Sequence, residues 1–339
     1  MKTRLFRFAV LILAAIWVSN SCSNANAQAV ADPPATETPT TENPIAEAPV
    51  EDASEKEKLT KEQKRAKRKA KREKEAEGPL YMRIHKDEAG KQLAMQTAIV
   101  KFVGKKGTSY EGQVVDLVGV VHIGQLEYYK DLDKRLSKYD TVLYELVAPD
   151  GTRIRPEDLQ KRRSIMASMQ TGMKDMLNLE YQLERIDYMA KNFRHADMSP
   201  TEFSEDLERR GDSIWKMGAR MMGAGLASQA SSGGDMGLLF AYFSKDRSKK
   251  MKQTMARQLV DIDLVTAGMD DANGENTLIK GRNEKAFKIL REELDAGKKN
   301  ISVFYGAGHL PDMAKRLKED FWMRSKSTVW LDAWDLTRN

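Results

Sequence analysis

The sequence predicts an α/β fold, in which a central mixed, largely parallel sheet is flanked by helices. An apolar run at residues 113–121 is followed by helical apolar spacing from Leu126 and by a second apolar run at residues 141–147. This strand–helix–strand pattern is typical of parallel strands joined by a crossover helix. A third apolar run, at residues 301–305, ends in glycine and precedes a helix opened by Pro311. We expect the first two strands to pair and the third to join them.

Two further apolar stretches, residues 97–103 and 327–336, are predicted to be strands near the two ends of the folded domain. The middle of the chain, roughly residues 156–297, is predicted to be helical. We therefore expect a long helical insertion that covers the active-site crevice and selects what enters it.

One helix start within this middle region is well marked. Ser199 is a candidate N-cap, Pro200 occupies the first helical position, and Glu202 completes a capping box. Apolar residues then follow on one helix face: Phe203, Leu207, Ile214, Met217 and Met221.

Residues 1–27 are predicted to be a signal peptide, so that the protein is exported to the periplasm or cell envelope. A basic start precedes an apolar run at residues 8–18, and Ala-Asn-Ala at residues 25–27 is an A-x-A cleavage site. Alternatively, the only cysteine, Cys22, ends a lipoprotein signal and carries a membrane anchor. Ser19 stands where such signals have a large aliphatic residue, which favours simple cleavage. The cleaved chain would hold no cysteine and thus no disulfide.

Two polar segments separate this leader from the folded domain at residues 78–339. Residues 28–54 are rich in Ala, Pro, Thr and Glu, and are expected to be a disordered tether because they hold too little apolar surface to fold. Residues 55–77 are polar on every face and are expected to be a charged, basic spacer. The alternative is a basic arm that binds anionic lipid or cell-wall polymer.

The net charge of +6 is unevenly distributed. Residues 1–27 carry +3, residues 28–54 carry −6 and residues 55–77 carry +5. Subtracting these from the total leaves +4 for the folded domain. Such a mildly basic domain argues against nucleic acid as its main partner.

Histidine is scarce, and two of the four histidines share one context. His122 ends a G-x-x-H motif that begins at Gly119, and His309 ends a second that begins at Gly306. Each motif follows an apolar strand, and open α/β sheets bind ligands at the carboxyl ends of their strands. We expect both imidazoles to face one crevice. These glycines, with Gly308, are expected to let the backbone turn and approach a substrate.

Glu145 is expected to complete the site. A carboxylate in an apolar run is costly to bury unless it is paired or binds a metal. Two imidazoles and a carboxylate are a common catalytic metal set. We therefore predict that His122, Glu145 and His309 bind a divalent ion (manganese, cobalt, iron or zinc), with Glu145 as third ligand or general base. The alternative is that the two histidines are loop residues whose hydrogen bonds are made within the protein. Glu145 would then form an ion pair with a basic side chain such as Arg282.

The motifs GVVH and GAGH, the YEL between them and KGRNE at residues 280–284 resemble the TraB/GumN/Tiki family of metal-dependent proteases. FRHADMSPTEF at residues 193–203 is also similar to that family, and the resemblance spans roughly residues 95–336. It implies an α/β domain related to haem-uptake and erythromycin-esterase-like proteins, some of which hydrolyse without a metal.

The resemblance also implies roles for particular residues. His122, Glu145 and His309 would be metal-binding or catalytic, and Arg282 would be a further site residue. A guanidinium there would clamp a substrate carboxylate or stabilise an oxyanion. Its alternative role is a structural ion pair with a carboxylate. For His195, a surface or capping role is favoured over that of a fourth ligand.

The sequence thus predicts a secreted or surface-anchored hydrolase, foremost a metal-dependent peptidase acting on peptide or protein substrates. A nucleophile elbow, H-E-x-x-H, a dinucleotide-binding glycine motif and a Walker A sequence are all missing. Two alternatives stay open. One is a non-catalytic protein that binds peptide, haem or metal in the same crevice, for sequestration or signalling. The other is a metal-free esterase with a histidine base. The sequence predicts no oligomeric state.

Overall fold

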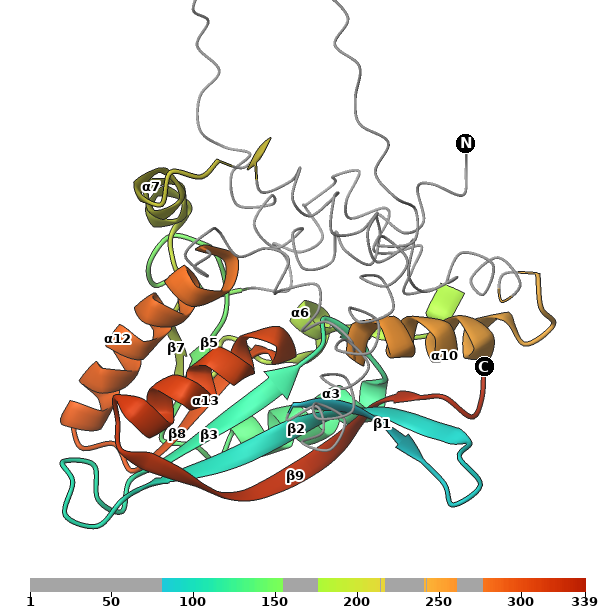
Figure 1. Cartoon of the computed structure of the whole chain (residues 1–339), viewed down its shortest axis with the longest axis horizontal. Coiled ribbons are helices and arrows are strands. Elements are labelled where there is room, and N and C mark those ends of the chain that lie inside the picture. The colour runs from blue at the N-terminus through green and yellow to red at the C-terminus, as the bar shows by residue number, and fades with distance from the viewer. Residues whose placement is uncertain (1–80, 155–175, 214, 217–240, 242, 261–276) are drawn as a thin grey trace, which may run out of the picture. The chain divides into compact units, whose positions relative to one another are not determined.

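The computed structural model describes residues 81–154, 176–213, 215–216, 241, 243–260 and 277–339 (Figure 1). These residues belong to one compact unit. The predicted signal peptide, Cys22, the tether and the basic spacer lie outside the described residues. In the part of the chain that is described, no helix has both the length and the apolar character needed to cross a membrane.

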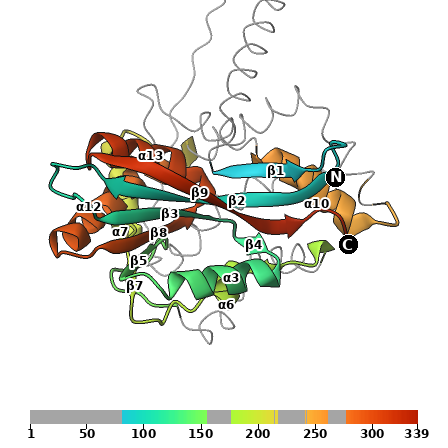
Figure 2. The ribbon, with the colours of Figure 1, turned by 90° about the horizontal axis from the view of Figure 1, so that it is seen from below.

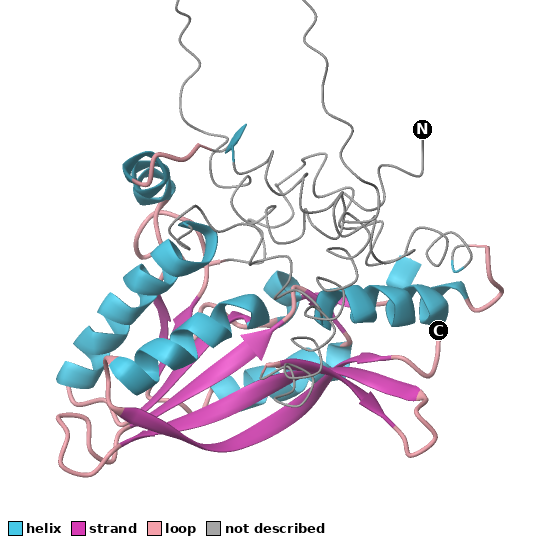
Figure 3. Cartoon of the chain, in the orientation of Figure 1, coloured by secondary structure: helices cyan, strands magenta, loops and turns pink. Residues whose placement is uncertain are grey.

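Seven strands form the main sheet, with helices on either side of it (Figure 3). In chain order they are β1 (Met82–Lys86), β2 (Gln92–Gly104), β3 (Val114–Val120), β5 (Thr141–Tyr144), β7 (Phe193–His195), β8 (Asn300–Gly306) and β9 (Met323–Asp335). The hydrogen-bonded neighbours are, in sequence, β1-β2-β3-β8-β5-β7, and β9 also pairs with β2. Two short strands, β4 (Ile123–Gly124) and β6 (Glu180–Tyr181), form a separate antiparallel pair.

The long strand β2 links the antiparallel part of the sheet to the parallel part. β1 pairs with residues 92–97 of β2 and β3 with residues 99–103, so these two strands share one edge of β2. β9 runs along the other edge, against residues 94–104. From β3 onward the neighbours β3, β8, β5 and β7 are all parallel. The predicted mixed, largely parallel sheet is therefore confirmed.

One predicted pairing is wrong. β5 does not pair with β3, because β8 lies between them and pairs with both. The crossover helix α3 (Leu126–Leu136) joins β3 to β5. A helix is about 10 Å wide and strands are about 4.8 Å apart, so such a helix spans two strand positions. The gap is filled by β8, which comes more than 150 residues later in the chain.

The two faces of the sheet have separate apolar cores. Along β8, Phe304 packs into one core, whereas Val303 and Tyr305 pack into the other. The first core includes residues of α3 and of α10 (Arg247–Val260). The second includes residues of α12 (Arg282–Asp295) and α13 (Leu310–Glu319). Figure 2 shows α3 and α13 on opposite sides of the strands. Because both faces are covered, the strands are apolar on both sides.

The prediction of a wholly helical middle is wrong within residues 176–213. Residues 193–195 form β7, the strand next to β5. The predicted cap is confirmed: α7 (Pro200–Arg209) begins with a reciprocal capping box between Ser199 and Glu202. That helix ends at Arg209, before Gly211, which has a φ of 68° that favours glycine. Residues 155–175, 217–240 and 261–276 of the predicted insertion lie outside the described residues.

Candidate functional site

The predicted site residues follow the carboxyl ends of adjacent parallel strands. His122 comes after β3, and Glu145 directly follows β5. His309 ends a short 3-10 helix, η2 (Ala307–His309), that continues from β8. Val120 pairs with Gly306, so the two motif strands end side by side. The predicted location at one edge of the sheet is therefore confirmed for all three residues.

Glu145 is buried and held on both of its oxygens. Its Oε2 accepts a hydrogen bond of 2.6 Å from the backbone N–H of Gly306, and its Oε1 accepts one of 2.8 Å from Nη2 of Arg282. The Oε1 atom also lies 3.5 Å from Nε2 of His309. The ion pair with Arg282, expected as an alternative to a metal-binding role, is thus present in the structure.

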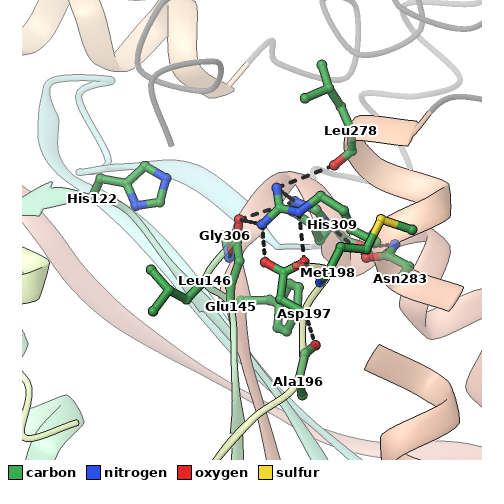
Figure 4. A network of polar contacts seen from close by, with 12 residues as sticks. His122, Glu145, Leu146, Ala196, Asp197, Met198, Leu278, Asn283, Gly306 and His309 are labelled. Carbon is green, nitrogen blue, oxygen red and sulfur yellow. Dashed lines mark hydrogen bonds and ion pairs between the residues drawn. The ribbon is translucent and has the colours of Figure 1, made fainter. Parts of the chain in front are cut away.

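Arg282 opens α12 directly after a π-helical turn, η1 (Thr277–Gly281), and is only 2% exposed. Its Nε and Nη2 contact Oδ1 and Oδ2 of Asp197 at 3.0 and 2.5 Å. Its Nη1 lies 3.5 Å from the carbonyl oxygen of Leu278 and 3.5 Å from Nε2 of His309 (Figure 4). Together with Oε1 of Glu145, these atoms provide one acceptor for each of the five N–H groups of the guanidinium. A substrate carboxylate could bind Arg282 only by displacing one of them.

Burial and Arg282 shift the pKa of Glu145 in opposite directions. Burial raises the pKa of Glu145, but the charge of Arg282, with His309 and His122, outweighs burial and holds that pKa well below its usual range. Burial lowers the pKa of Arg282, whereas Asp197 and Glu145 raise it well above the usual value for arginine. Both groups are therefore charged at neutral pH.

The hydrogen bonds around His309 determine which ring nitrogen carries the proton. Nδ2 of Asn283 donates to Oδ2 of Asp312 at 2.8 Å and to the carbonyl oxygen of His309 at 3.2 Å. Because both partners are acceptors, the nitrogen of this amide is assigned and its Oδ1 must accept. That Oδ1 lies 2.7 Å from Nδ1 of His309, which therefore carries the hydrogen. The other ring nitrogen, Nε2, lies 3.5 Å from Oε1 of Glu145.

His122 has a similar arrangement on the other side of the site. Its Nδ1 lies 3.0 Å from Oε1 of Gln182, and Nε2 of that glutamine donates to the hydroxyl of Tyr188 at 2.7 Å. The backbone N–H of Gln182 also donates to the carbonyl oxygen of His122. Nδ1 of His122 therefore faces the side-chain amide of Gln182. Each motif histidine is thus oriented by a side-chain amide.

The donor set fits a divalent ion in its chemistry. It offers two imidazole Nε2 atoms and an ionised carboxylate, and metal-binding histidines usually donate their other N–H to an oxygen. In both rings Nδ1 faces a side-chain amide oxygen. In its geometry, Oε1 of Glu145 and Nε2 of His309 lie 3.5 Å apart, but both atoms face the guanidinium of Arg282. His122 stands apart from the hydrogen-bonded network in Figure 4. Within the described ranges, no three His, Cys, Asp or Glu side chains are grouped closely enough to hold a metal.

Two of the three motif glycines, Gly119 and Gly306, are closely packed against the protein itself. A Cβ on Gly119 would lie 3.1 Å from Leu310 and 3.2 Å from the carbonyl oxygen of Ala98. A Cβ on Gly306 would lie 3.2 Å from Oε2 of Glu145. A Cβ on Gly308 would meet nothing within 4 Å. None of the three has a positive φ. Their predicted contact with substrate stays a prediction.

Three residues that complete the site were not predicted as site residues. Asp197 comes two residues after β7 and just before the capped helix α7. That position is the one sequence feature that could have identified it as a site residue. Asn283 follows Arg282, and Gln182 opens the short helix α6 (Gln182–Arg185). Their roles depend on tertiary contacts that no local pattern indicates.

The remaining two histidines do not join the site. His195 is buried, and its Nε2 lies 2.5 Å from the carbonyl oxygen of Leu146. Of the favoured surface or capping role, the surface part is therefore wrong, because the side chain is buried at the end of β7. His85 is exposed on β1.

Comparison of the chain with protein-family models, with curated proteins and with solved structures found no match.

Proposed function

We propose that this protein is a hydrolase of peptide substrates that holds a divalent ion with His122, Glu145 and His309. The observation that carries the proposal is the shared orientation of the two motif histidines. In each ring Nδ1 lies 3.0 Å or less from a side-chain amide oxygen, so Nε2 is the ring nitrogen that a metal ion would bind. This is the way in which metal-binding histidines are usually oriented.

The geometry assigns different tasks to the polar residues. Glu145 is better suited to bind a cation than to accept a proton, because its low pKa makes it a weak base. Arg282 holds Glu145 in place and keeps it ionised, rather than orienting the substrate. A bound ion would polarise the scissile carbonyl and lower the pKa of a bound water. This assignment agrees with the resemblance to the TraB/GumN/Tiki family and with the predicted export to the periplasm or cell envelope.

A second candidate is a metal-free esterase with His309 as general base. It is favoured by the ion pair between Arg282 and Glu145, which engages the carboxylate without a metal. Asn283 would fix the ring of His309, as the third member of a triad orients its histidine.

The deciding experiment is a cleavage assay on the full chain, with a peptide library read by mass spectrometry. The protein is stripped with a chelator and reconstituted with manganese, cobalt, iron or zinc. The proposal expects cleavage that depends on one of these ions and is lost in Glu145→Gln. Glu319→Gln, which changes an exposed carboxylate on α13, is the matched control.

Other results would contradict the proposal in distinct ways. Ester hydrolysis that survives the chelator and is lost in His309→Ala would support the second candidate. Stoichiometric peptide binding without turnover, unchanged in Glu145→Ala, would overturn both and indicate a binding protein.

A further inference from the structure

The turn between α13 and β9 holds an exposed tryptophan in a strained backbone conformation. Trp322 has a φ of 54°, in the left-handed region that is costly for a bulky side chain. The residue is 58% exposed, so burial of the ring does not offset this strain. In the described part of the chain, the other non-glycine residue with a positive φ is Asn178, and asparagine tolerates that region. Backbone strain of this kind is often kept at functional sites.

Basic side chains surround this tryptophan. The backbone N–H of Lys105 donates to the carbonyl oxygen of Trp322 at 3.1 Å, which joins the loop after β2 to the turn before β9. Lys106 follows in that loop, and two further cations, Arg324 and Lys326, follow in β9. All four cations are exposed. The acidic residues of the same loop and turn, at positions 111 and 320, are half as many. We call this surface the basic–aromatic patch, and it consists of Lys105, Lys106, Trp322, Arg324 and Lys326.

The part of β9 that carries the patch is an open edge of the sheet (Figure 1). Side chains of a strand alternate between its two faces, yet residues 324–329 are all exposed, so neither face is covered there. Lys326 is the extra residue of a bulge, because its neighbours Ser325 and Ser327 pair with consecutive residues of β2. A bulge changes the direction in which a side chain points. Both the charges and the ring are therefore accessible to a large partner.

We propose that the basic–aromatic patch docks on the surface of an anionic phospholipid bilayer, with the ring of Trp322 at the level of the headgroups. The cations complement the charge of the lipid, and tryptophan is enriched where water meets hydrocarbon. Arg324 and Val114, the first residue of β3, both pair with Val103 of β2. The patch thus lies beside the amino-terminal end of β3, whereas the candidate site lies past the carboxyl ends of the parallel strands. Docking would leave the site open to substrates in solution.

The rival explanation is that the charges and the bulge only keep this edge from pairing with another chain. It accounts for Lys326. It does not account for Trp322, because an exposed aromatic ring beside an unpaired edge would favour association. The two explanations differ in what they expect of Trp322 in the presence of lipid.

The first test uses the full chain and vesicles of phosphatidylcholine, alone or mixed in equal amounts with phosphatidylglycerol. Brominated phosphatidylcholine in these vesicles quenches the emission of a tryptophan that reaches the lipid. We expect quenching in the wild type with the anionic vesicles and less of it in Trp322→Asn. Trp215→Asn, which removes an 89% exposed ring outside the patch, should be quenched as the wild type is. Trp322→Asn should also raise the melting temperature by about 2–4 °C, because asparagine relieves the strain.

The second test measures the contribution of charge by sedimentation with the anionic vesicles. We expect Lys105→Gln/Lys106→Gln to bind about 25-fold more weakly than the wild type, or about 5-fold for each cation removed. The matched control, Lys86→Gln/Lys91→Gln, removes two exposed lysines around the opposite end of β2 and should bind as the wild type does. Residues 55–77 are present in every variant, so their own attraction for lipid does not affect the comparison.

Several results would overturn the inference. Equal quenching in the wild type and in Trp322→Asn would do so, as would equal affinity in the wild type and in Lys105→Gln/Lys106→Gln, because another part of the chain would then bind the lipid. Binding that is as strong to phosphatidylcholine alone would show that charge plays no role, and a wild type that binds neither vesicle would leave no docking to explain. A lower melting temperature in Trp322→Asn would contradict the argument from strain. None of these results bears on the proposed hydrolase activity.

Discussion

Two buried carboxyl groups lie at opposite ends of the parallel strands, with opposite electrostatic results. Past the carboxyl end of β5, beside the end of β8, Glu145 has a pKa well below its usual range. In the amino-terminal half of β3, Asp116 has a raised pKa, because burial outweighs the hydrogen bond from Tyr139 and the charge of Lys101. Burial acts in the same direction on both carboxyl groups, so the partners make the difference.

The partners differ in distance and in exposure to water. Glu145 has a buried arginine at 2.8 Å and a backbone N–H at 2.6 Å. Asp116 has Lys101 at 3.9 Å, and that lysine side chain is 42% exposed. Oδ1 of Asp116 and Oγ of Ser302, its register partner on β8, have no hydrogen-bond partner in the structure. Burial therefore prevails at Asp116, whereas the buried, directly bonded cation prevails at Glu145.

The largest expected effect comes from removing that cation. Arg282→Met leaves Glu145 and Asp197 buried without their common partner, and should lower the free energy of unfolding by about 3–5 kcal/mol. Urea unfolding followed by circular dichroism measures this loss. The control is Arg316→Met, which breaks a more exposed pair with Asp312 and should cost at most about 1 kcal/mol. Equal losses in the two variants would show that burial does not set the energetics of the site.

An intermediate effect is expected from crowding β3 just before its carboxyl end. Gly119→Ala places a methyl group against Leu310 and the backbone of Ala98, and should cost about 1–3 kcal/mol. Gly308→Ala enters open space and should change stability by less than about 0.5 kcal/mol. Thermal unfolding of both variants tests this. A loss of peptide cleavage in Gly308→Ala at unchanged stability would support the predicted substrate contact of Gly308.

The smallest effect, and one of opposite sign, is expected in the amino-terminal half of β3. Asp116→Asn removes a carboxyl group whose ionisation is opposed by burial, so it should stabilise the protein at neutral pH by about 1 kcal/mol. A carboxyl group whose pKa is raised by folding favours the folded state at low pH and loses that contribution as pH rises. The gain should therefore shrink as the pH falls toward 3.8, the ordinary value for aspartate. Urea titrations across that range would contradict the account if the gain grew instead.

The sequence predicted the features that local patterns encode. Apolar runs located the five predicted strands, and a Ser-Pro-Thr-Glu start located α7. The two G-x-x-H motifs indicated which strand ends carry the site, because parallel strands bring their carboxyl ends to one edge.

The features that the sequence did not indicate are tertiary. β7 is only three residues long and includes Arg194 and His195, so it has no apolar run to mark it. The place of β8 between β3 and β5 depends on packing across the sheet. The bonds of Arg282 to Asp197 and Glu145 join residues 85 and 137 positions apart.

The central claim is that the two G-x-x-H histidines share one metal site, and the metal content of the purified full chain tests it most directly. Elemental mass spectrometry would be applied to the wild type, His122→Ala and His309→Ala after reconstitution with manganese, cobalt, iron and zinc. The account predicts about one divalent ion per chain in the wild type and a clear loss of it in both variants. A wild type that retains no ion, or an ion that survives both substitutions, would contradict it.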